Sequence, residues 1–258
     1  VKMVVWALVS AVPWVVGAVA DEHSRLFWWA AAAAIDLLGM RLRHPVPGLP
    51  VPGRDEIDFD LPHQIERCQL FLIICLGEAI LTTGSAIIHG LDEPLVVVTG
   101  VASLLVIIGV WGLFFGPANE EHVLAPMASE SHGDDPAPNV SLAILATNGQ
   151  QVLVLGMVAF AVGAEVVVAG PAGPLRPAAV AALFGGIVTC VTAFWYFLVR
   201  STGHRMWISL AVSDAVLIGA AAVSAIVGLP GIAVMGLLVV VTASTALGFN
   251  RETRRLAR

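Results

Sequence analysis

The stretch QLFLIICLGEAILTTGSAII (residues 69–88) decides the fold. Its only charged residue is Glu78, and the rest of the run is predominantly apolar. A helix needs about 20 such residues to cross the hydrocarbon core of a bilayer. The stretch therefore predicts a transmembrane helix, with one carboxyl group near its middle.

Similar apolar runs lie on both sides of this stretch, at residues 4–20, 26–40, 95–115, 140–168, 178–199, 207–227 and 232–249. Over the 258 residues, 58% are apolar and 12% are charged, and the mean hydropathy is +0.88. These proportions exclude a disordered chain and an ordinary soluble globule. The alternating pattern of a membrane barrel is absent from the sequence. We predict an all-α, polytopic transmembrane helix bundle of about eight spans, forming one domain over residues 1–258.

The first run allows a second interpretation. Lys2 precedes it, and Ala18-Val19-Ala20 resembles a cleavage site before Asp21, as in a secretory signal peptide. Cleavage there would leave seven spans. The alternative is a first membrane helix that contains Pro13.

Basic residues fall mostly on one side of an eight-span bundle. That side carries Lys2, Arg41, Arg43, Arg54, Arg200, Arg205, Arg251, Arg254, Arg255 and Arg258. The opposite side carries Arg25 and Arg176. Positive charge favours the cytoplasmic side, so both termini are predicted to be cytoplasmic. The basic tail 251–258 is expected to lie on anionic lipid headgroups.

Two longer connections interrupt the runs. Residues 44–62 form a Pro/Gly linker, in which Pro47-Gly48 and Pro52-Gly53 favour type II turns. Residues 117–139 form an acidic loop, which we interpret as a solvated linker, with a divalent-cation site as the alternative. The ligands of that alternative would be Glu120, Glu121, His122, Glu130, His132, Asp134 and Asp135. We expect no metal and no cofactor, and we interpret Cys68, Cys75 and Cys190 as small core residues.

Ionisable groups inside apolar runs are costly in lipid and are therefore candidates for function. They are Glu78, Glu66, Arg67, His63, Asp36, Asp214 and Glu165. At 100° per residue, one helix stripe carries Arg67, Glu78, Thr82 and Ser85. Such a stripe should face the bundle interior or a water-filled cavity, with Thr82 and Ser85 as supporting polar groups.

Each candidate keeps two interpretations. Glu78 is either a carboxyl group that carries protons or a neutral acid hydrogen-bonded to another helix. Glu66 and Arg67 form either a gate or a structural ion pair, and His63 with Glu66 is at best half of a metal site.

Three further acids are harder to place. Asp36 and Asp214 are the natural residues to converge with Glu78. Glu165 is expected to extend towards the membrane surface near a helix end. Gly156 and Gly163, which precede Glu165, predict a small-residue face for close helix packing.

The segment HxxERxxLFxIIxLGE (residues 63–78) resembles the signature of the bacterial low-temperature-requirement A (LtrA) family. Weaker similarities are the tryptophan-and-acid helix at 26–36, WGLFF at 111–115 and GMVAFAVGAE at 156–165. The resemblance covers essentially this whole chain, although the family's N-terminal helices with an E-L-F-F-D-L motif are not in it. In the family a histidine often stands where this chain has Gln150. The resemblance implies a multi-pass protein of the bacterial cytoplasmic (inner) membrane, and it implies no settled activity.

Three functional classes remain open. The first is a transporter of a proton, an ion or a small solute that uses Glu78. The second is a structural, sensory or partner-binding membrane protein in which the charges fix packing. The third is an intramembrane enzyme that acts on lipid, which the sequence favours least because it contains no recognisable hydrolase or prenyl-transfer motif. A retinal protein is excluded, since the only lysine is Lys2. The expected partners are the lipid bilayer and a second copy of the chain, and nucleic acid is not among them.

Overall fold

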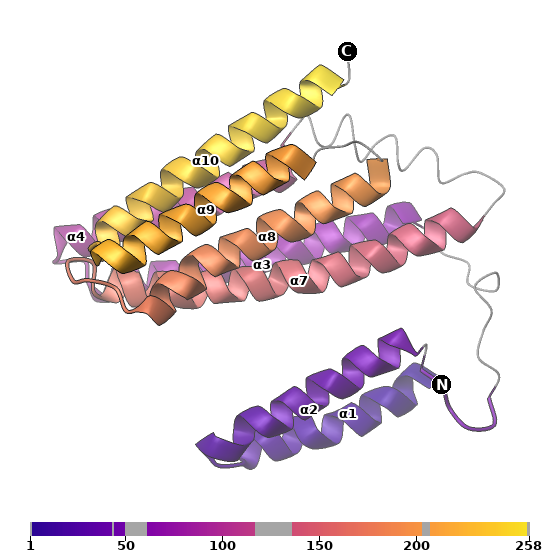
Figure 1. Ribbon diagram of the computed structural model, residues 1–258. Coiled ribbons are helices and arrows are strands. Elements are labelled where there is room, and N and C mark those ends of the chain that lie inside the picture. Colours follow the sequence, from indigo (N-terminus) through magenta and orange to yellow (C-terminus); the bar gives the residue numbers. More distant parts are fainter. Residues whose placement is uncertain (1, 43, 50–60, 117–135, 203–206, 257–258) are drawn as a thin grey trace. The chain divides into compact units, whose positions relative to one another are not determined.

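The computed structural model describes residues 2–42, 44–49, 61–116, 136–202 and 207–256. Within these residues it contains helices and no strands, which confirms the all-α prediction (Figure 1). The helices are α1 (Lys2–Val19), α2 (Glu22–Arg41), α3 (Leu61–His89), α4 (Pro94–Phe114), α7 (Pro136–Ala169), α8 (Pro177–Thr202), α9 (Trp207–Val227) and α10 (Gly231–Leu256).

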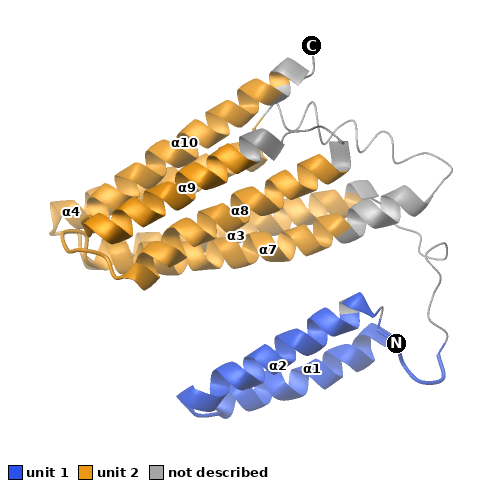
Figure 2. Cartoon of the chain, in the orientation of Figure 1, with its two compact units in different colours: residues 1–58 blue, residues 59–258 orange. Residues whose placement is uncertain are grey.

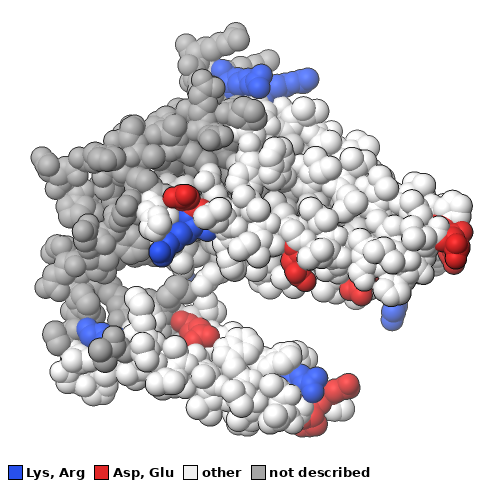
Figure 3. Space-filling model, turned by 180° about the vertical axis from the view of Figure 1, so that it is seen from behind, with Lys and Arg blue, Asp and Glu red and all other residues white. Residues whose placement is uncertain are grey.

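Six of these helices are long and apolar enough to cross a membrane, namely α1, α3, α4, α7, α8 and α10. In α9 the apolar stretch is shorter, at Ala211–Val227. Large apolar side chains such as Leu70, Ile74 and Leu81 of α3 are exposed. Figure 3 shows one face of the molecule, on which few of the described side chains carry charge. This surface suits a lipid environment, so the chain is a polytopic membrane protein.

The third helix begins earlier than its apolar run. It starts at Leu61, eight residues before Gln69. Pro62 sits in its first turn, where a missing N–H costs nothing. The polar segment 63–68 thus continues the transmembrane helix by almost two turns.

The predicted connections are only partly described. Pro47-Gly48 forms the expected type II turn, because Gly48 has a φ of 82° and the N–H of Leu49 donates to the carbonyl oxygen of Val46 at 3.1 Å. Pro52-Gly53 and the seven candidate ligands of the acidic loop lie outside the described residues, as do Arg43, Arg54, Arg205 and Arg258.

The chain divides into two compact units, residues 1–58 and 59–258 (Figure 2). In the first unit α1 and α2 form a helical hairpin. A Cβ atom on Gly17 would lie 2.5 Å from Cδ1 of Trp29, so the two helices touch closely there. Trp6 Nε1 donates to the carbonyl oxygen of Pro45 at 2.9 Å and fixes the segment after α2. That the whole chain acts as one domain stays a prediction.

Asp21 stands immediately before α2, and its carboxylate accepts a hydrogen bond from the hydroxyl of Ser24. This hydrogen bond, with backbone N–H donors of the first turn, holds the pKa of Asp21 below its ordinary value of 3.8.

The Ser24→Ala substitution should raise the pKa of Asp21 towards 3.8, because it removes the main cause of the shift. A carboxyl group whose pKa is lowered by folding stabilises the fold above its unfolded pKa, and this contribution is lost as the pH falls through the folded pKa. NMR titration of the Asp21 carboxyl carbon measures both values. Equal titration curves in wild type and variant would contradict the assignment.

The second unit packs α3, α4 and α7–α10 around a shared apolar core. Phe194 of α8 lies at its centre, with ring centroids 4.3 Å from Phe114 of α4 and 5.3 Å from Phe249 of α10. Trp195 stands edge-on to Phe249 at 5.0 Å. Such aromatic pairs add to the free energy gained by burying their area.

The closest helix contact joins α7 to α8 through glycines. A Cβ atom on Gly186 would lie 2.6 Å from the carbonyl oxygen of Gly156, and one on Gly163 would lie 2.9 Å from Leu183. The predicted small-residue face of α7 is therefore confirmed at Gly156 and Gly163. Without a hydrophobic force between helices in lipid, such close backbone approach is a main source of packing energy.

The Gly186→Ala substitution should lower the free energy of unfolding by about 1–3 kcal/mol, because the methyl group overlaps the Gly156 backbone. Gly185→Ala is the matched control, since nothing lies within 4 Å of a Cβ atom there. It should be neutral or stabilising by up to about 1 kcal/mol. Thermal denaturation in detergent compares the two, and equal effects would show that the contact is not tight.

Candidate functional site

Glu78, Thr82 and Ser85 of α3 line one cavity with a volume of about 660 Å³. The spacing of four and three residues places these side chains on one helix face, as the sequence predicts. Glu165 of α7 lines the same cavity, and the remaining wall residues are Leu81, Ala86, His89, Gly90, Glu93, Val96 and Ala169. The cavity thus lies between α3, the end of α7 and the start of α4.

Local hydrogen bonds organise the α3 wall. The hydroxyl of Thr82 donates to the backbone oxygen of Glu78 at 3.0 Å, and His89 Nδ1 lies 2.7 Å from the backbone oxygen of Ser85. Within the part of the chain that the structure describes, neither the Glu78 nor the Glu165 carboxylate has a hydrogen-bonding or ionic partner. Both side chains are exposed, so the cavity is an open groove in which both carboxylates are available to a ligand or to water.

The cavity is electronegative. Glu78, Glu93 and Glu165 contribute carboxylates, His89 contributes an imidazole, and no lysine or arginine is among its described wall residues. A concave site with walls of one sign concentrates ions of the opposite sign. His89 and Glu78 are eleven residues apart in α3. The wall therefore extends about 16 Å along the helix axis, at 1.5 Å per residue.

Glu165 is a wall residue of this cavity that the sequence does not place beside Glu78. We expected it simply to extend towards the membrane surface, yet it lines the cavity together with Glu78. A signal was present in the sequence. Glu165 follows Gly156 by nine residues, which places it about 180° around the helix from the glycine that contacts α8.

The other predicted α3 residues lie at the opposite end of the helix, outside the cavity. His63 Nδ1 is 3.8 Å from Glu66 Oε2, and both side chains are more than half exposed. A pair so exposed contributes little to stability. The described ionic partner of Glu66 is thus His63, while Arg67 is exposed and does not line the cavity.

Asp36 and Asp214 each meet a donor within their own unit. Asp36 Oδ2 accepts a hydrogen bond from Trp14 Nε1 at 3.2 Å, which joins α2 to α1. Asp214 Oδ2 accepts one from Thr192 Oγ1 at 2.8 Å, which joins α9 to α8. The other carboxyl oxygen of Asp214 is buried without a partner among the described residues. Asp214 does not line the cavity with Glu78.

The hydrogen bond between Thr192 and Asp214 should hold α8 and α9 together. Thr192→Val should lower the free energy of unfolding by about 0.6–2 kcal/mol, which is the range of free energy that one hydrogen bond between membrane helices contributes. Thr189→Val is the control, because Thr189 donates to Gly185 of its own helix at 2.7 Å. Chemical denaturation in mixed micelles measures both, and an equal loss in the two variants would contradict the interhelical role.

Sequence reasoning also missed a set of buried hydroxyl groups between α3 and α4. Thr83 Oγ1 lies 3.5 Å from Ser103 Oγ, and both residues are almost fully buried. Thr99 is buried as well, and its hydroxyl has no partner within the described residues. Single hydroxyl residues in apolar runs gave no signal, because their partners lie on another helix.

Comparison with known proteins gives the family. The model of the bacterial low temperature requirement A protein (LtrA) matches residues 1–246. The chain belongs to the LtrA family. This confirms the resemblance drawn from residues 63–78.

One curated relative of this LtrA chain is an uncharacterized protein of Rhizobium meliloti (strain 1021). It is 28% identical over 170 residues, which make up 66% of this chain and 40% of that protein. The chain therefore spans less than half the length of the relative it matches. No solved structure matches the chain.

Proposed function

We propose that this LtrA protein moves a proton or a small cation across the bacterial cytoplasmic membrane, with Glu78 as the residue that binds it. The observation that carries the proposal is the shared cavity of Glu78 and Glu165, which come from two helices long and apolar enough to span a membrane. Carboxylates at such positions are expensive in lipid and mark ion pathways in many membrane proteins.

The orientation predicted from the arginines supports a direction of entry. It places the connection between α3 and α4 outside the cytoplasm, so His89, Gly90 and Glu93 would form the outer mouth of the cavity. A cation would enter there and reach Glu78 about 16 Å further along the axis of α3. Thr82 and Ser85 offer hydroxyl groups along the way.

On the face of α3 that points into the bundle, the region beside and beyond Glu78 is closed by apolar packing. Leu72, Leu76 and Ala79 of α3 are buried, as are Met157 and Phe160 of α7. Transport would therefore need a movement of α3 against α7 that opens this region towards the other side. The cavity and the closed core together favour a carrier over an open channel.

The first test is ion flux in proteoliposomes that contain the purified protein. Proton flux, followed with an internal pH-sensitive dye, should fall by at least about tenfold in Glu78→Gln, which is equivalent to about 1.4 kcal/mol in the barrier. The amide keeps the size of the side chain and loses its charge and its proton. Glu165→Gln should also reduce flux, because it weakens the field that holds the cation.

Glu22→Gln is the control, since Glu22 is an exposed residue in the first turn of α2. All variants are compared at equal amounts of monodisperse protein. If wild type carries neither protons nor monovalent cations under either polarity of potential, the proposal fails. A structural or sensory role for the α3 charges would then account better for the structure, and tightly copurified lipid would instead favour an enzyme.

A further inference from the structure

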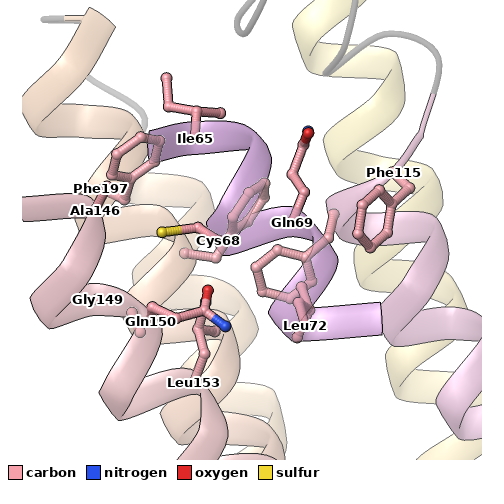
Figure 4. Close-up of a pocket in the computed structure, with 13 residues that line it drawn as sticks. Ile65, Cys68, Gln69, Leu72, Phe115, Ala146, Gly149, Gln150, Leu153 and Phe197 are labelled. Atoms are coloured by element: carbon pink, nitrogen blue, oxygen red, sulfur yellow. The ribbon is translucent and has the colours of Figure 1, made fainter. Parts of the chain in front are cut away.

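Figure 4 shows a second, smaller cavity. It lies at the opposite end of α3 from the cavity lined by Glu78 and Glu165, which we call the acidic cavity. Its volume is about 80 Å³, and it lies among the beginnings of α3 and α7 and the ends of α4 and α8. The predicted orientation places this end at the cytoplasmic side. The two cavities share no wall residue.

Four phenylalanines line this cavity. Phe114 is the last residue of α4 and Phe115 follows it, while Phe194 and Phe197 come from α8. No acidic or basic side chain is among its described wall residues. A space of about 80 Å³ admits only part of a lipid-sized molecule, and it suits an uncharged, apolar part that can lie against flat rings.

One polar group inside it lacks a partner. Gln150 of α7 extends its carboxamide between α7 and α3 in Figure 4. Its Nε2 is buried and has no hydrogen-bond partner among the described residues. A buried donor without an acceptor costs free energy that a bound acceptor would restore.

We propose that this cavity binds an uncharged, apolar molecule of the membrane through a carbonyl oxygen that accepts a hydrogen bond from Gln150. A phosphate or carboxylate head would need a cationic partner, and none is present among the described wall residues. A carbonyl group supplies the acceptor without charge. The proposal does not depend on the acidic cavity.

Two kinds of membrane compound carry this chemistry, namely quinones with an apolar tail and neutral diacyl esters. Decylubiquinone and dioctanoylglycerol serve as the two probes. Each is titrated into the full-length chain in detergent by isothermal titration calorimetry. One of the two should bind saturably, and the one that binds identifies the source of the carbonyl group.

Gly149→Leu tests the location of the ligand. Gly149 lines the cavity, and nothing lies within 4 Å of a Cβ atom built there, so leucine fills the space without disturbing the helix. Binding should be lost. Gly219→Leu on α9 is the matched control. Nothing lies within 4 Å of a Cβ atom built on Gly219, and this residue is not part of the cavity wall. The Gly219 variant should bind the probe as tightly as wild type does.

Gln150→Leu tests the hydrogen bond and should weaken binding by about two- to tenfold. Wild-type affinity in this variant would overturn the role of Gln150. Saturable binding of neither probe, or equal binding by the Gly149 and Gly219 variants, would overturn the site itself.

A chemical readout places the ligand independently of affinity. Cys68 lines the cavity, whereas Cys75 lies two turns further along α3 outside it, and both are partly exposed. The probe that binds should slow alkylation of Cys68 by at least about fivefold and leave the rate at Cys75 unchanged, because a bound ring shields only the cavity wall. Equal protection of both thiols, or protection of neither, would contradict the proposed location.

Discussion

The backbone contact between α7 and α8 sets the arrangement on which the two cavities depend. Gly156 and Gly186 touch so closely that neither helix can rotate without a clash. In lipid, where apolar side chains gain nothing by leaving the solvent, this kind of contact decides how helices pack. With its glycine face fixed on α8, α7 must turn Glu165 to the other side, where α3 and the acidic cavity lie.

Along α3 and α7 the chemistry changes from one end to the other. At one end three carboxylates and an imidazole line a wide cavity, and at the other four phenylalanines and the carboxamides of Gln69 and Gln150 line a narrow one. Between them α3 and α7 are closed by Leu76, Met157 and Phe160. The same pair of helices therefore offers a site for positive charge and a site for an uncharged ligand, separated by a tightly packed apolar layer.

The sequence predicts the parts of this arrangement that lie within one helix. The polar spacing of Glu78, Thr82 and Ser85 follows from helix periodicity alone, and all three line the same cavity, whereas Arg67, which is expected on the same stripe, does not. The partners of these residues come from other helices, and periodicity carries no information about which helix lies opposite. For this reason the sequence does not place Glu165 beside Glu78, and Asp214 meets Thr192 instead of approaching Glu78.

The packing of the glycines indicates which helix would have to move during transport. Gly156 and Gly163 lock α7 to α8, whereas nothing lies within 4 Å of a Cβ atom at Gly77 or Gly84 of α3. The interface of α3 with α7 instead depends on larger apolar side chains and on one hydrogen bond, from Gln64 Nε2 to Thr147 Oγ1 at 3.2 Å, and such contacts can shift at lower cost than two backbones in contact. A carrier needs one rigid part and one movable part on either side of its site. In this fold α7 with α8 meets the first requirement, and α3, which holds Glu78, meets the second.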